Sequence, residues 1–163
     1  MKKLTFNQQR TLKTFHLIFA GVWLTCVFLL LCLPFVVTNF SSGDDLYLYN
    51  KIYHFIDLAV LSPSAAGTLL TGLLYSLLTP WGFFKHGWLI YKWIITLLVI
   101  GVGTFYLGPM VSKLLLIAGE KKFLAIQDEY YIESQLIGIW AAIINSILLI
   151  IAVVVSVFKP KMK

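Results

Sequence analysis

Four apolar runs, each about 20 residues long or slightly longer, dominate this chain. They cover residues of about 15–37, 56–78, 88–107 and 136–158. An α-helix needs about 20 consecutive apolar residues to cross the hydrocarbon core of a bilayer, because it rises only about 1.5 Å per residue. Backbone N–H and C=O groups find no water in that core, so a spanning segment has to pair them internally. The runs therefore predict an all-α integral membrane protein, a bundle of four transmembrane helices.

The composition agrees with this fold class. Of the 163 residues, 60% are hydrophobic and 12% are charged, whereas soluble domains average about 25% charged residues. Four spans and their links occupy the whole chain, so we expect a single membrane domain over residues 1–163. The formal charge of +6 does not form a basic patch interleaved with polar surface. We therefore expect contact with the lipid bilayer and none with nucleic acid.

The distribution of basic residues predicts the orientation of the bundle. Four spans place both termini on one side of the membrane, together with the short link after the second span. The basic residues on that side are Lys2, Lys3, Arg10, Lys13, Lys85, Lys159, Lys161 and Lys163. The other side has fewer lysines and most of the acidic residues. By the positive-inside rule both termini are cytoplasmic, which predicts a multi-pass protein of the cell (inner) membrane.

Small and polar residues recur at helical spacing in the second and fourth runs. They are Ser64, Thr68, Gly72 and Ser76 in the second, and Gly138, Ala142 and Asn145 in the fourth. In lipid, small residues let helices approach closely, and polar groups form hydrogen bonds between helices. We interpret these positions as the seams of a compact bundle. Asn145 is either a hydrogen-bonding group between helices or a ligand or transport residue.

Two ionisable residues lie inside the apolar runs near the side of the termini. Lys92 is in the third run and His16 is at the start of the first, so the topology places both at one membrane depth and one site lined by both is predicted. A charge at the bilayer centre costs about 2.5 to 3.5 kcal/mol, so a buried lysine needs a partner or a functional role. The alternatives are that Lys92 reaches the surface by snorkelling or forms a structural ion pair, and that His16 exposes its ring at the interface.

Further polar residues lie toward the opposite side. His54 and Asp57 are three residues apart at the start of the second run. We expect such a pair to form a local hydrogen bond. A metal site is the weaker alternative. Tyr130 and Tyr131 lie in the mixed stretch before the fourth run and are expected at the level of the lipid headgroups.

Short motifs in three runs resemble known families. Residues 16–23 read HLIFAGVW and residues 87–92 read GWLIYK. They resemble the H-x6-W and W-L-x-x-K signatures of the four-helix HemJ-type protoporphyrinogen oxidases. Residues 61–74, LSPSAAGTLLTGLL, resemble uncharacterised bacterial integral membrane proteins and the membrane domain of copper-resistance D proteins.

The resemblance to the HemJ-type enzymes implies heme b as a cofactor and the oxidation of protoporphyrinogen IX. Carried over to this chain, it implies that His16 is a heme-iron ligand or catalytic group. It also implies that Lys92 is a partner for porphyrin carboxylates. A neutral imidazole suits iron, and an ammonium suits a propionate.

Three classes of function stay open, and with them the question of enzymatic activity. The first is a non-catalytic structural or accessory component, in a larger membrane assembly or a homo-oligomer, as the uncharacterised relatives suggest. The second is a heme- or porphyrin-binding redox protein that uses His16 and Lys92. The third is a small transporter or metal-handling protein with Lys92, Asn145, His54 and Asp57 as polar stations.

Overall fold

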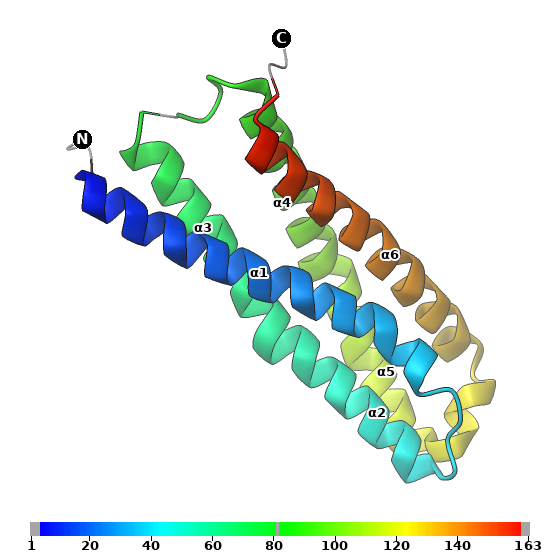
Figure 1. Ribbon diagram of the computed structural model, residues 1–163. Coiled ribbons are helices and arrows are strands. Elements are labelled where there is room, and N and C mark those ends of the chain that lie inside the picture. Colours follow the sequence, from blue (N-terminus) through cyan, green and yellow to red (C-terminus); the bar gives the residue numbers. More distant parts are fainter. Residues whose placement is uncertain (1–3, 81, 161–163) are drawn as a thin grey trace.

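A computed structural model describes residues 4–80 and 82–160, which form a bundle of four long antiparallel helices (Figure 1). The elements are α1 (Phe6–Val36), α2 (Gly43–Phe55), η1 (Ile56–Leu61), α3 (Ser62–Leu78), α4 (Gly87–Val102), η2 (Gly103–Leu107), α5 (Gly108–Lys121), η3 (Lys122–Gln127) and α6 (Glu129–Phe158). The second helix is continuous from α2 to α3, and the third from α4 to η3. The described residues contain no strand, so the predicted all-α fold is confirmed.

All four helices are long and apolar enough to cross a membrane. Many of their Leu, Ile, Val and Phe side chains are exposed on the outside of the bundle, as expected for a surface that contacts lipid. The helices extend beyond the apolar runs. The first begins at Phe6, and the third continues past Leu107 to Gln127. The chain is therefore a four-helix membrane protein whose helices are longer than their apolar parts.

Each long helix has two close neighbours. α1 packs against α3 and α6, α4 packs against α6, and α2 packs against α5. The first and third helices therefore face each other diagonally across the bundle, as do the second and fourth. The start of α1 and the end of α6 lie at the same end of the bundle, which we call the termini end (Figure 1). The opposite end, with residues 37–42 and η3, is the loop end.

Two prolines explain the irregular turns inside the second and third helices. η1 and η2 are π-helical turns, and the backbone N–H at the end of each bonds a carbonyl five residues back: Ser62 to Asp57, and Gly108 to Gly103. Pro63 and Pro109 follow directly. A proline brings no N–H, and its ring collides with the carbonyl four residues back. The wider π turn relieves this collision, so both helices continue through their prolines.

Tyr131, expected at the level of the lipid headgroups, has its side chain inside the bundle. Its side chain is 5% exposed and belongs to a small core at the loop end. Asn50 Nδ2 and Gln135 Nε2 donate hydrogen bonds to its hydroxyl, at 2.8 and 3.0 Å. These two amides supply inside the protein the partners that water would supply at an interface, and the headgroup-level depth of Tyr131 stays a prediction. Tyr130 stays exposed, with Lys113 Nζ 3.7 Å from its ring centre.

Asp128 sets the start of α6. Its carboxylate accepts a hydrogen bond from the Tyr131 N–H, at 2.9 Å, and another from the Lys121 ammonium. The Lys121 hydrogen bond, followed by the Tyr131 bond, holds the pKa of Asp128 below its usual value. A carboxylate at this position pairs a backbone N–H that the helix leaves unpaired. The chain therefore turns sharply between η3 and α6.

Candidate functional site

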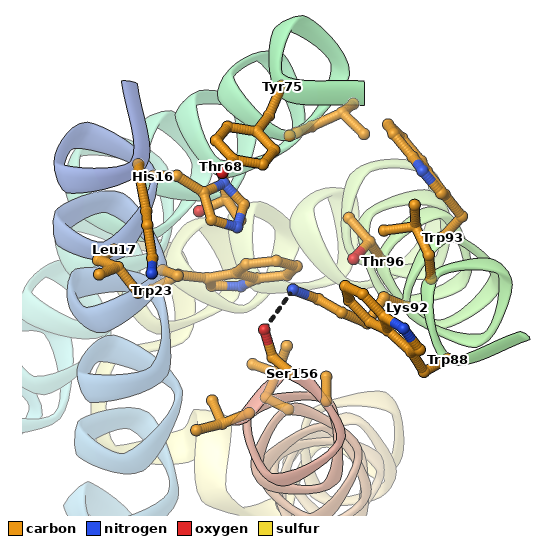
Figure 2. A pocket seen from close by; sticks show the side chains of 18 of the residues that line it. His16, Leu17, Trp23, Thr68, Tyr75, Trp88, Lys92, Trp93, Thr96 and Ser156 are labelled. Carbon is orange, nitrogen blue, oxygen red and sulfur yellow. Dashed lines mark hydrogen bonds between the residues drawn. The ribbon is translucent and has the colours of Figure 1, made fainter. Parts of the chain in front are cut away.

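His16 and Lys92 line one cavity of about 270 Å³ in the termini half of the bundle. We call it the termini-end cavity. His16 projects from α1 and Lys92 projects from α4, and the two side chains point toward each other across the cavity (Figure 2). α1 and α4 are diagonal neighbours, so residues on their inward faces meet at the bundle centre. The structure thus brings together two residues that are far apart in the sequence.

The Lys92 ammonium is turned into the bundle. Its Nζ donates a hydrogen bond to Ser156 Oγ of α6, at 3.1 Å (Figure 2). The two ion pairs found among the described residues both lie at the loop end, and neither involves Lys92. Lys92 therefore points neither to lipid headgroups nor to a carboxylate of the described chain. An ammonium has three N–H donors, and Ser156 accepts one of them.

The hydrogen bonds of His16 assign its tautomer. Its Nδ1 lies 3.0 Å from Thr71 Oγ1. The Thr71 hydroxyl donates its own hydrogen to the carbonyl of Gly67, at 2.6 Å, so it accepts from His16. Nδ1 then carries the proton and Nε2 keeps a lone pair. This arrangement lets Nε2 accept a hydrogen bond or bind a metal ion while the ring is held in place.

Aromatic side chains form much of the remaining wall. Trp23, Tyr75, Trp88 and Trp93 all line the termini-end cavity (Figure 2). Trp23 is 3% exposed and belongs to the central core, so its indole closes the cavity toward the middle of the molecule. These rings offer a flat apolar surface to a bound molecule.

The termini-end cavity carries positive charge only. Lys13 and Lys159 line it together with Lys92, and the described lining residues include no Asp or Glu. Charges interact more strongly in a low-dielectric interior than in water. The group that complements this cavity is therefore an anion.

A second cavity, of about 180 Å³, lies nearer the loop end. We call it the loop-end cavity. Trp23 and Leu69 line both cavities and separate them. Asp57 of η1 and Asn145 of α6 line the loop-end cavity, whereas His54 does not.

His54 and Asp57 are not brought together at one metal site. The His54 Nε2 lies 3.2 Å from Ser112 Oγ of α5 and so is used for packing between helices. Among the described residues there is no group of three or more His, Cys, Asp or Glu side chains that would hold a metal ion. Of the two, Asp57 lines the loop-end cavity and His54 does not.

The residues predicted as helix seams border the two cavities. Thr68, Gly72 and Ser76 line the termini-end cavity, and Gly138, Ala142 and Asn145 line the loop-end cavity. Ser64 is buried and donates to the carbonyl of Leu61. α3 and α6 are diagonal neighbours with little direct contact. Their small side chains therefore leave space at the bundle centre instead of bringing these two helices close together.

Sequence reasoning missed two residues of the site. Thr71 holds the His16 ring, and Trp93 adds an aromatic wall that contacts Phe83 with ring centres 5.5 Å apart. Thr71 is a polar residue in an apolar run, which was the available signal. Its partner on another helix could not be read from spacing along its own helix.

Comparison of the chain with models of known protein families, with curated proteins and with solved structures finds no match. The two cavities and their side chains are therefore the features that bear on function.

Proposed function

We propose that the protein binds an anionic amphiphile in the termini-end cavity, with the anionic group on the Lys92 ammonium. The observation that carries this proposal is an inward-pointing lysine in a cavity whose described lining includes no acidic residue. Taking an ammonium out of water without a counter-charge is unfavourable, and intramembrane charges mark binding or transport sites. A purely structural or accessory component would gain nothing from this arrangement.

The lining suggests the rest of the ligand. Trp23, Trp88 and Trp93 present flat apolar surfaces beside the lysine. Ligand sites of this kind bury an apolar body and use a few polar groups to orient it. A molecule with a flat or chain-like apolar body and a carboxylate or phosphate at one end fits both features.

A porphyrin is the specific ligand that the motif resemblance favours, and His16 supports its heme form. His16 is the one histidine among the described lining residues, and its Nε2 keeps a lone pair while Thr71 holds Nδ1. This is the usual arrangement of an iron-binding histidine, and Lys92 would hold a propionate. Bound heme would supply one-electron redox chemistry. The chain's own residues would bind it, orient it and exclude water.

We also infer that the termini end faces the cytoplasm of a bacterial cell. The basic residues of the chain are concentrated at that end, as the positive-inside rule requires. The anionic group of the ligand would then lie near the cytoplasmic surface of the membrane.

Ligand titration of the detergent-purified protein tests the proposal. We expect protoporphyrin IX to quench tryptophan fluorescence in a saturable way, with phosphatidic acid as the comparison ligand with a phosphate. Lys92→Met should weaken binding about 10-fold or more, because a hydrogen bond to a charged group contributes about 1.5 to 3 kcal/mol. Lys51→Met, which removes an exposed lysine at the loop end, is the control and should bind as the wild type does.

The heme form has its own readout. Hemin should give a Soret band shifted from that of free hemin, and His16→Phe should remove the shift while metal-free protoporphyrin still binds. Equal affinity in Lys92→Met and wild type would overturn the proposal. Binding of no anionic amphiphile at all would favour an accessory role within a larger assembly.

A further inference from the structure

The loop-end cavity contains three polar side chains whose polar groups have no hydrogen-bonding partner among the described residues. Asp57, Tyr53 and Asn145 all line it. Among the described residues, no hydrogen bond or ion pair involves the Asp57 carboxylate, the Tyr53 hydroxyl or the Asn145 amide. Tyr53 and Asp57 are four residues apart on one continuous helix, so they share a face. Polar groups inside a membrane bundle are normally paired, because each unpaired one costs free energy.

The Asp57 carboxylate is not held in an ion pair. His54, one turn earlier, interacts with it electrostatically but directs Nε2 to Ser112. Of the two lysines of α5, Lys113 lies over the ring of Tyr130 and Lys121 pairs with Asp128. No described lysine or arginine comes within ion-pair distance of Asp57. The cavity therefore has a negative charge and room for a group that would neutralise it.

The backbone around the cavity adds one oxygen atom. Thr104 of η2 lines it. The Gly108 N–H bonds the carbonyl of Gly103, five residues back, and the next residue, Pro109, has no N–H for the carbonyl of Thr104. Broken or widened helical turns with free carbonyls are typical of cation sites in membrane transporters.

We propose that the loop-end cavity binds a monovalent alkali cation, Na⁺ or K⁺, through Asp57, Asn145 and Tyr53. The side chains offer a carboxylate, an amide oxygen and a phenol oxygen, and hard cations prefer oxygen ligands. One carboxylate balances one positive charge, whereas a divalent ion would leave an excess charge in an apolar interior. This site uses none of the residues that hold the ligand of the termini-end cavity, so either proposal can fail without the other.

Thermal unfolding of the detergent-purified full chain tests the cation site. At constant ionic strength, replacing choline chloride by NaCl or KCl should raise the Tm by at least about 3 °C, with a saturable dependence on concentration, because a cation that binds only the folded state stabilises it. Asp57→Asn should abolish the rise or weaken the apparent affinity at least 10-fold. Glu120→Gln, which removes an exposed carboxylate at the loop end, is the matched control and should respond as the wild type does.

Equilibrium dialysis with ²²Na⁺ or ⁸⁶Rb⁺ measures binding directly, and one saturable site is expected. If Asp57→Asn does not fold, Asn145→Leu and Tyr53→Phe take its place, and each should weaken binding several-fold. A Tm that is equal in choline, Na⁺ and K⁺ would overturn the proposal. An undiminished cation response in Asp57→Asn, or in both substitute variants, would overturn it as well.

Discussion

Tyr131 shows how a polar side chain is accommodated inside this bundle. Its hydroxyl accepts hydrogen bonds from Asn50 and Gln135, which belong to two different long helices. Asn50, 3% exposed, donates its second N–H to the carbonyl of Leu46. All the polar groups of this cluster therefore depend on one another, in contrast to Asp57 and Asn145 at the nearby cavity.

Replacing Tyr131 should destabilise the protein much more than replacing its neighbour. Tyr131→Phe leaves the amides of Asn50 and Gln135 without their acceptor, and such a loss costs about 1 to 3 kcal/mol of unfolding free energy. Tyr130→Phe removes an exposed hydroxyl and should change stability by less than about 0.5 kcal/mol. Thermal unfolding of both variants in one detergent checks this. Similar losses in the two would show that the Tyr131 hydroxyl is not held as described.

Gly67 determines how closely α1 and α3 pack. A Cβ atom on Gly67 would lie 2.6 Å from a ring carbon of Phe19, so the residue leaves no room for a side chain. A Cβ atom on Gly21 of α1, in contrast, would have no other atom within 4 Å. The two helices are therefore tightly packed at a glycine outside the predicted seams. In α3, Gly67 allows close contact with α1. The small residues Thr68, Gly72 and Ser76 border the termini-end cavity instead.

Alanine at these two glycines should act in opposite directions. Gly67→Ala forces Phe19 to move, and overpacking of this kind costs about 1 to 3 kcal/mol. Gly21→Ala meets open space and should be neutral or stabilising by up to about 1 kcal/mol, because alanine favours the helix. The Tm values of the two variants provide the comparison. A destabilised Gly21→Ala variant, or an unchanged Gly67→Ala variant, would contradict this account of the contact.

The bundle as a whole contains two cavities of opposite charge along its length. Lys92 lies in the termini-end cavity and Asp57 in the loop-end cavity, with Trp23 and Leu69 between them. Both charges lie between diagonally placed helices, where side chains from all four helices face inward. The short links at each end keep the helices antiparallel, so the two cavities are at different depths.

Cysteine labelling tests the orientation inferred for the bundle. In a background with Cys26→Ala and Cys32→Ala, Ser41→Cys places a thiol in the exposed link at the loop end, and Lys85→Cys places one in the exposed link at the termini end. A membrane-impermeant maleimide should label Ser41→Cys in intact cells, and Lys85→Cys only after permeabilisation. The reverse pattern would show that the termini end faces outward.

Much of the architecture followed from local properties of the chain. Apolar runs of about 20 residues are long enough to span a bilayer, and lipid leaves them no alternative to internal hydrogen bonding. Antiparallel helices of known rise then place His16 and Lys92 at one depth, and both indeed line one cavity. These predictions succeeded because length and depth depend on distance along a helix, which the order of residues defines.

The tertiary structure alone decided which side chains meet. In the folded bundle Thr71 is the hydrogen-bond partner of His16, and Ser156 is that of Lys92. The residues predicted as helix seams line cavities. It also buried Tyr131, which resembles an interfacial residue in the sequence. Periodicity within one helix identifies a face but not the helix that this face contacts. That choice depends on how all four helices rotate and pack together, which is a property of the assembled bundle.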